Sequence, residues 1–347
     1  MPLNKISLKN FTVFDQLDME FSGGINVFVG VNGKGKTHIM KVLYSACQSA
    51  DKRVSFAQKI VRCFSPDDHR ISRLVRRKQG NNDAFLRVVG SDVNGTESKS
   101  ISAKFSAKTK KWEADITGEE GWEKLFQYLP STFIPAKEIL SNSYNLNAAV
   151  EKNNVSFDDT YLDIVNSAKI DISVGKNAAA KQSILNGIEQ IIEGKVLFDT
   201  KRDEFYLKHG NSKLEFNLVA EGIRKIALVW QLVKNGTLEK GAVLFWDEPE
   251  ANINPVHIPI IVDMLFELQR NGVQIFIATH DYIFSKYIEI KTQKVDQVSF
   301  FSFYDENESV CCESNRRFSE LRHNPIIAAF DKLLDEVYAE RVGDNGR

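Results

Sequence analysis

The sequence predicts an α/β fold built on a parallel sheet, with a small antiparallel β subdomain and a helical insertion. The last third of the chain alternates apolar strands with amphipathic helices. Near the N-terminus a glycine-rich loop joins the strand INVFVG to a helix, and short strands with polar turns lie between these regions. Parallel neighbours need crossover connections, so the alternation favours strands joined by helices over a meander.

The composition is that of a soluble globular protein, and 347 residues are ample for a hydrophobic core. A formal net charge of -1 gives no global attraction to nucleic acid or to an anionic membrane. The four cysteines show neither metal-binding nor disulfide spacing, which favours reduced thiols. With no signal-peptide pattern and no apolar run long enough for a span, we expect a cytoplasmic protein without membrane contact.

The N-terminal region carries a complete phosphate-binding loop. GVNGKGKT, Gly30 to Thr37, fits G-x-x-x-x-G-K-[ST] between an apolar strand and an apolar-faced helix. Glycines let backbone N–H groups turn inward around a phosphate, and the following helix presents its positive end. Lys36 can reach the β- and γ-phosphate oxygens, and Thr37 offers a hydroxyl to Mg²⁺. We expect a nucleotide to be held by Gly30, Asn32, Gly33, Lys34, Gly35, Lys36, Thr37 and His38.

Residues 51–138 form a basic segment and a β subdomain. Short antiparallel strands are predicted over 83–116 with a turn at DVNGTE, and STFIPAKE is a strand stopped by Pro135. The basic side chains either grip nucleic-acid phosphates or face solvent or a partner. We favour the second, since HRISRLVRRK fits an amphipathic helix. The basic residues are Lys52, Arg53, Lys59, Arg62, Arg70, Arg73, Arg76, Arg77 and Lys78.

Residues 139–214 are predicted to form a helical insertion followed by a β-ribbon. The helical part, 139–194, lacks sustained heptads and is too short for a coiled-coil arm, so we expect a compact cap used for oligomer contacts. The ribbon is GKVLFDTKRDEFYLKHGNSKLEFNLV.

Two adjacent acids follow an apolar strand in VLFWDEPEANINP. The strand delivers Asp247 at its carboxyl end, the edge where such sheets bind ligands, and Asp247 is expected to hold Mg²⁺ together with Thr37. Glu248, one residue on, points elsewhere and can orient or deprotonate the attacking water.

A third strand, VQIFIATHD, ends in Thr279-His280-Asp281. Its carboxyl end should lie beside Asp247, because the two strands and the helix between them form one right-handed crossover unit. His280 is then expected to donate a hydrogen bond to the γ-phosphate.

Residues 301–347 are expected to add a strand and a terminal helix, FSELRHNPIIAAFDKLLDEVY, that packs on the core. RVGDNGR is expected to be a frayed tail. The predicted apolar side consists of Ile326, Ile327, Phe330, Leu333, Leu334 and Val337.

Together these motifs resemble the ABC-type ATPase heads of the SMC, RecF and OLD-nuclease group. ISLKNFTVFDQLDMEFSGGINVFVGVNGKGKT is similar to their first strands and Walker A loop, VLFWDEPEANINP to Walker B, catalytic glutamate and D-loop, and IFIATHD to the switch-histidine strand. The resemblance implies one P-loop NTPase domain over 1–347, with 1–50 and 215–300 as its nucleotide-binding core. It also implies ATP and Mg²⁺ as cofactors.

By the resemblance, LVAEGIRKIA occupies the place of the signature loop. Gly222 keeps the glycine before a helix, so its N–H group can face the nucleotide of a second protomer. The usual serine is replaced by Ala220 or Glu221, depending on the alignment. Arg224 or Lys225 is the alternative donor.

Two further family loops are placed by the resemblance. Asn252 and Asn254 fall in the D-loop, which crosses a dimer interface. For the glutamine loop, Lys137 or Glu138 of FIPAKE is the candidate, and Gln48 is a poorer one.

The expected function is therefore a Mg-ATP-hydrolysing ATPase that forms a homodimer or higher oligomer and switches a separately encoded effector. AEG and IPAKE are similar to strings in small ATPases of anti-phage systems such as Septu, PARIS and retron-linked ATPases, which implies a nuclease or toxin as effector. The chain shows no nuclease motif of its own. The alternatives are a RecF-like DNA-binding repair ATPase and a nucleotide-gated scaffold without turnover.

Overall fold

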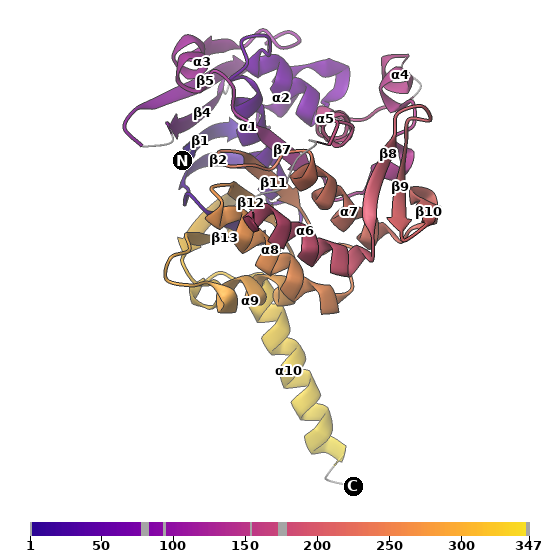
Figure 1. Ribbon diagram of the computed structural model, residues 1–347. Helices are drawn as coiled ribbons and strands as arrows, with labels where there is room; N and C mark the ends of the chain where they lie inside the picture. The colour runs from indigo at the N-terminus through magenta and orange to yellow at the C-terminus, as the bar shows by residue number, and fades with distance from the viewer. Residues whose placement is uncertain (1, 78–82, 93–94, 153–154, 173–178, 345–347) are drawn as a thin grey trace.

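The computed structural model describes residues 2–77, 83–92, 95–152, 155–172 and 179–344 (Figure 1). At its centre is a six-stranded sheet in the order β14-β13-β3-β12-β11-β7, parallel except for β14. Strands β11 and β12 are parallel neighbours joined by helix α8, as the crossover prediction required. The strands are β3 (Ile25–Gly30), β7 (Ser131–Ile134), β11 (Val243–Asp247), β12 (Gln274–Ala278), β13 (Val298–Glu306) and β14 (Ser309–Asn315).

The inner strands β3, β12 and β11 are buried on both faces, which explains why they are mainly apolar. On β11, Val243 and Phe245 belong to one hydrophobic cluster, while Leu244 and Trp246 belong to the cluster on the other face. The first cluster includes α1, and the second includes α7, α8 and α9. These helices are α1 (Lys36–Gln48), α7 (Glu221–Lys234), α8 (Ile258–Arg270) and α9 (Tyr282–Lys291), with the 3₁₀ turns η5 (Pro255–His257) and η6 (Phe318–Glu320) beside them.

The β subdomain is a second, antiparallel sheet in the order β2-β1-β4-β5-β6. It covers the α1 side of the central sheet, and the Trp122 indole N–H donates to the Ala46 carbonyl at 2.8 Å. The predicted turn at DVNGTE includes residues 93–94, which lie outside the described ranges. The elements are β1 (Leu3–Phe11), β2 (Phe14–Glu20), β4 (Asp83–Ser91), β5 (Ser98–Ser106), β6 (Asp115–Thr117), α2 (Phe56–Phe64) and α3 (Glu119–Phe126).

The amphipathic helix predicted over HRISRLVRRK is wrong. The chain instead forms two short 3₁₀ turns, η1 (Asp67–His69) and η2 (Ile71–Leu74), and then runs extended. Leu74 accepts a backbone hydrogen bond from Thr12, and Val75 forms a β-bridge with Phe11. Pairing with the end of β1 therefore outweighs the local helical spacing, and Lys78 lies outside the described residues.

The insertion is compact. Helix α5 joins the body through three lysine–aspartate contacts, in which Lys41 pairs with Asp158, and Lys59 pairs with Asp159 and Asp163. The predicted ribbon is a three-stranded antiparallel sheet, β10-β9-β8. Its elements are η3 (Leu140–Asn142), α4 (Leu146–Glu151), α5 (Asp159–Ala168), α6 (Ala179–Ile192), β8 (Lys195–Asp199), β9 (Glu204–His209), β10 (Ser212–Glu215) and η4 (Phe216–Leu218).

The terminal helix α10 (Pro325–Asp344) departs from its prediction, because it packs on the core only at its base. Phe330 stacks on Tyr282 with ring centroids 4.1 Å apart, but Leu333, Leu334 and Val337 are 53%, 41% and 39% exposed. Figure 1 shows the helix leaving the body beside α9. A straight helix that starts at the edge of the core runs past it, so its later turns find no surface. No helix within the described residues is long and apolar enough to cross a membrane.

Candidate functional site

The phosphate loop joins β3 to the N-terminus of α1. Gly35 caps this helix with φ +82°, and a Cβ there would lie 2.4 Å from the Phe14 ring, so glycine is required twice over. The Lys36 Nζ donates to the carbonyls of Gly30 and Val31 at 2.7 and 3.0 Å. Burial lowers the pKa of Lys36 to about 8, against the opposing effect of Asp247 and Glu248. The ammonium is thus held over the loop, where a phosphate group would sit.

The other loop residues are placed around this centre. Asn32 and Gly33 are exposed, which leaves the tip of the loop open to a ligand. The Lys34 side chain pairs with Asp305 on β13, so only its backbone faces the loop. The Nδ1 of His38 lies 3.1 Å from the Thr12 hydroxyl, and burial lowers the pKa of His38 to about 4. His38 is therefore a neutral group whose ring contacts Thr12 and Phe64, outside the phosphate loop.

Asp247 lies directly beside the start of α1. The Thr37 hydroxyl donates to its Oδ2 at 3.0 Å, which brings two oxygen ligands from distant segments into contact. Burial raises the pKa of Asp247 to about 6, so the carboxyl is mainly ionised at neutral pH. A hydroxyl and a carboxylate fit Mg²⁺, which binds few protein oxygens and takes the rest from phosphates and water.

Glu248 and His280 face each other across the same edge. The register pairs Asp247 with Ala278, and Glu248 donates its backbone N–H to the Ala278 carbonyl at 2.8 Å. The His280 Nε2 lies 3.6 Å from the Glu248 Oε1. Burial, and then Lys36, lower the pKa of His280, so the imidazole is neutral at pH 7. A carboxylate and a neutral imidazole therefore border the region in front of the phosphate loop.

Glu250 is a site residue that the sequence reasoning missed. Its Oε1 accepts hydrogen bonds from the Thr279 hydroxyl at 2.7 Å and from the His280 backbone N–H at 3.1 Å. Its Oε2 is buried without a hydrogen-bond partner among the described residues, and burial raises its pKa. Glu250 links the acid-pair loop to His280. The third acid in DEPE was the available signal, but its partner Thr279 lies 29 positions away.

Helix α7 lies against the acid-pair loop. A Cβ on Gly222 would lie 2.1 Å from the Asn252 carbonyl oxygen, so only glycine allows this approach. Ala220, the N-cap residue, is exposed and makes no side-chain cap. The expectation that Arg224 or Lys225 replaces the missing serine is wrong for both. Lys225 donates to the Glu248 carbonyl at 2.8 Å, and the Arg224 guanidinium donates to Glu138 at 2.6 Å and to the Val219 carbonyl at 2.6 Å.

Two of the three glutamine-loop candidates, Glu138 and Gln48, form their side-chain contacts away from the metal ligands. Glu138 is taken up by Arg224 and by the Ser141 hydroxyl, and its side chain is 1% exposed. Gln48, at the end of α1, donates to the Ser131 hydroxyl at 2.9 Å. Since Ser131 begins β7, Gln48 lies at the amino edge of the sheet, opposite the acid pair. Lys137 is exposed.

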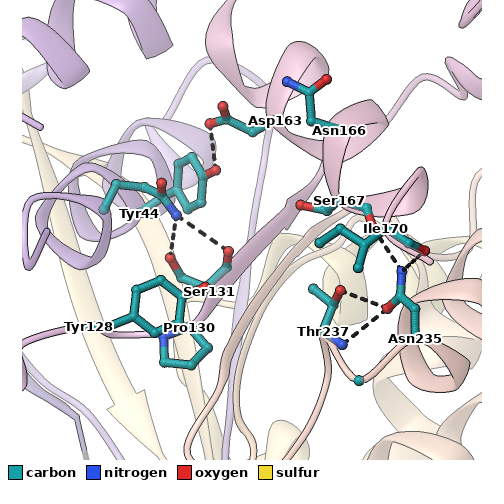
Figure 2. A pocket seen from close by; sticks show the side chains of 12 residues that line it. Tyr44, Tyr128, Pro130, Ser131, Asp163, Asn166, Ser167, Ile170, Asn235 and Thr237 are labelled. Carbon is teal, nitrogen blue, oxygen red and sulfur yellow. Dashed lines mark hydrogen bonds between the residues drawn. The ribbon is translucent and has the colours of Figure 1, made fainter. Parts of the chain in front are cut away.

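A cavity of about 370 Å³ lies at that amino edge, away from the phosphate loop (Figure 2). Several polar groups that line it form hydrogen bonds within the chain. The Tyr44 hydroxyl donates to Asp163 at 2.6 Å, and the Asn235 amide donates to the Ser167 carbonyl at 2.9 Å. Its hydrogen-bonding capacity serves the packing of α5 on α1 and α7, and none of the phosphate-loop residues lines it.

Several members of the basic segment are engaged by the protein itself. Lys59 is 7% exposed and contacts two aspartates, and Arg76 donates to the Glu308 carbonyl at 2.7 Å. Arg53 pairs with Asp51, and Arg73 with Asp67. These basic side chains therefore form contacts within the protein, and the segment is not a uniformly solvated face.

Comparison with protein families finds two overlapping matches. The profile described as "AAA domain" matches residues 5–205. A second, whose description names an AAA domain, the AbiEii toxin and a type IV TA system, matches residues 133–285. Together the two ranges include the phosphate loop, the acid pair and His280.

Among curated proteins, the DNA replication and repair protein RecF of Lactococcus lactis subsp. cremoris (strain SK11) is 31% identical over 77 residues. This match covers 22% of the chain and 21% of that protein. RecF of Cytophaga hutchinsonii is 47% identical over 47 residues, covering 14% of the chain and 12% of that protein. The chain thus spans about a fifth or less of the length of these relatives.

Among solved structures, an SMC head bound to the C-terminal winged-helix domain of ScpA superposes with a TM-score of 0.61 at 12% identity. The match covers 92% of this chain and 99% of that one. The Smc head with an extended coiled coil from Pyrococcus furiosus, bound to the C-terminal domain of ScpA, gives a TM-score of 0.54 at 10% identity, covering 97% and 100%. At such identities the likeness concerns the fold. The predicted P-loop ATPase head with an antiparallel β subdomain is confirmed as an SMC-head fold.

Proposed function

The chain belongs to the AAA domain family, whose profile covers more than half of it, and from this premise we propose that it binds and hydrolyses Mg-ATP. The observation that carries the proposal is the meeting of three distant segments at one sheet edge. Lys36 lies over the loop, Thr37 contacts Asp247, and His280 faces Glu248.

Each group has a distinct task in this proposal. The backbone N–H groups of residues 30–37 and the Lys36 ammonium bind the phosphates. Thr37 and Asp247 would hold Mg²⁺, which when bound neutralises phosphate charge. Glu248 accepts the proton of the attacking water or orients it, and neutral His280 donates a hydrogen bond to the γ-phosphate.

Calorimetric titration of the purified chain with ATP, with and without Mg²⁺, tests the proposal. We expect saturable binding that Mg²⁺ strengthens, together with phosphate release in a steady-state assay. If the folded protein shows no heat of binding on titration with ATP, the proposal is contradicted.

We further propose that two copies close on the nucleotide, each presenting its VAEG loop and the D-loop residues Asn252 and Asn254 to the other. Asn252 and Asn254 are exposed, and Gly222 packs directly under the Asn252 carbonyl, so one surface carries both loops. The exposed N-terminus of α7 would then face a phosphate of the partner's nucleotide.

Restoring a hydroxyl at the N-cap of α7 tests this surface. We expect Ala220→Ser to stabilise the fold by about 1 kcal/mol, because serine can accept a hydrogen bond from the helix N-terminus and alanine cannot. In the closed dimer the same hydroxyl should raise ATP turnover. Thermal unfolding and phosphate release are the measurements. Ala220→Val, which adds bulk without a hydroxyl, should give neither gain, and a gain in both variants would contradict this reasoning.

Glu250 is expected to position His280. Glu250→Ala removes the acceptor of two hydrogen bonds and should lower kcat about 10-fold through misplacement, leaving the Kd for ATP unchanged. Glu250→Gln keeps an acceptor oxygen and should recover most of the rate. In a protein that already carries His280→Ala, adding Glu250→Ala should not lower kcat further. Additive losses would instead indicate a general structural role.

The output of the ATPase is proposed to be the switching of a separate effector protein, a nuclease or toxin of an anti-phage system. Support comes from the second family match, whose description names a toxin and a toxin–antitoxin system, and from AEG and IPAKE. Co-expression with the products of neighbouring genes tests this, with ATP-dependent co-purification as the expected result. Residence in a replication operon, without such a partner, would favour repair.

A RecF-like DNA-binding ATPase is the second candidate, favoured by the RecF matches. It predicts ATP-dependent binding to duplex or gapped DNA with a steep salt dependence. Lys59 and Arg76 form contacts within the chain, so fewer basic side chains are left to contact DNA phosphates. A nucleotide-gated scaffold differs from both, since it predicts ATP binding without turnover.

A further inference from the structure

Beyond its base, α10 carries an apolar stripe that nothing in the described chain covers. At 100° per residue, Leu333, Leu334, Val337 and Tyr338 continue the side of the helix on which Phe330 packs against Tyr282. All four are exposed, Leu333 by 53% and Tyr338 by 62%. Contiguous exposed apolar surface of this kind marks an interaction site.

Acidic residues border this stripe. Asp331 and Asp335 lie along one side of it, and Glu336 and Glu340 along the other, while Lys332 lies on the opposite face of the helix. All of these residues are exposed. A surface that covers the stripe should therefore be an apolar ridge with basic flanks.

Such a ridge exists on α9. Ile283 and Ile290, seven residues apart and so on the same face, are 40% and 62% exposed. Lys286 lies to one side of them and Lys291 to the other, with side chains 37% and 26% exposed. Lys291 pairs with Asp263, which is 62% exposed, in a surface ion pair that is weak enough to be exchanged for a new partner. Lys286 pairs with Glu289, whose side chain is only 6% exposed, so that ion pair is retained.

We propose that the distal half of α10 docks on the α9 ridge of a second copy of this chain, in an interface that does not require nucleotide. The pairing places an acid-bordered apolar stripe on a lysine-bordered apolar ridge. It differs from the proposed nucleotide sandwich, which uses the VAEG loop and the D-loop.

Two other pairings are less favourable. The chain's own α9 is out of reach, because Phe330 already packs on Tyr282 at the start of α9 and a straight helix cannot turn back. Pairing α10 with α10 of a second copy would bring acidic borders together, and like charges oppose such contact. The α9 ridge satisfies both the apolar and the charge requirement.

The test is the assembly state of the full chain in nucleotide-free buffer with EDTA, by sedimentation velocity over a concentration series. We expect the wild type to self-associate, and Leu334→Glu or Ile290→Glu to weaken association about 100-fold, as for a central interface residue. Ala339→Glu, on the opposite face of α10, and Gln293→Glu, beyond the end of α9, are the matched controls and should assemble like the wild type. Because all four positions are exposed, thermal unfolding should be unchanged.

Mixing the two disrupted variants identifies the partner surface. The Leu334→Glu chain keeps an intact α9 and the Ile290→Glu chain an intact α10, so a mixture should associate while neither does alone. A monomeric wild type, or a Leu334→Glu chain that assembles normally, would overturn the proposal. So would an Ile290→Glu chain that still assembles, since α10 would then pair elsewhere. ATP affinity, unaffected in either variant, separates this outcome from failure of the ATPase proposal.

Discussion

Replacing Lys36 by methionine should weaken Mg-ATP binding about 100-fold, because one charge-assisted contact to phosphate accounts for up to about 3 kcal/mol. The ammonium is held by the Gly30 and Val31 carbonyls and is largely buried, so it is in place before the nucleotide arrives. Methionine keeps most of the length of the side chain and removes the ammonium. Calorimetric titration with ATP and Mg²⁺ measures the loss directly.

Lys34→Met is the matched control for this experiment. Lys34 lies two residues earlier in the same loop, but its ammonium pairs with Asp305. Its loss should leave ATP affinity close to that of the wild type. Equal effects at the two positions would mean that the loop responds to net charge rather than to one placed ammonium.

Replacing Glu248 by glutamine should lower ATP turnover by 100-fold or more, with ATP still bound, since general-base catalysis contributes about 10²–10⁴-fold. Glutamine retains the shape and can orient water but cannot take its proton. Glu248 sits at φ +46°, directly after β11 and 3.6 Å from the His280 ring, so the carboxylate is aimed by the backbone. Phosphate release and ATP retention are the two measurements, and ATP-dependent dimers should accumulate.

Glu239→Gln makes the same chemical change at a carboxylate that is 61% exposed and paired with Lys181, and it should turn over at the wild-type rate. If the wild type itself shows no turnover, and Glu248→Gln alters neither ATP retention nor assembly, the scaffold alternative is the better description.

The groups at the proposed ATP site could be predicted because each is encoded locally. Eight consecutive residues specify the phosphate loop, and a buried strand followed at once by two acids specifies the acid pair. Parallel strands deliver their carboxyl ends to one edge, so three separate motifs imply one location. The structure brings Thr37 to Asp247, and His280 to Glu248, without any further assumption.

The incorrect expectations share a physical cause. Local spacing in HRISRLVRRK fits a helix, but hydrogen bonds to β1 outweigh it. Arg224 was expected to donate to a phosphate, but its guanidinium pairs with Glu138, which lies 86 positions away in the sequence. In both cases the deciding contact comes from a distant segment, which periodicity cannot register.

From the sequence alone came the fold class, the phosphate loop, the acid pair and their common edge, because short contiguous patterns and strand polarity are properties of the chain itself. Only the tertiary structure decided that Glu250 holds Thr279 and His280, that Gly222 lies under Asn252, and that α10 leaves the body with its apolar stripe uncovered. Those outcomes depend on which distant surfaces come into contact. An amphipathic pattern in the sequence indicates that a helix has an apolar face to bury, but it does not indicate which surface will cover that face.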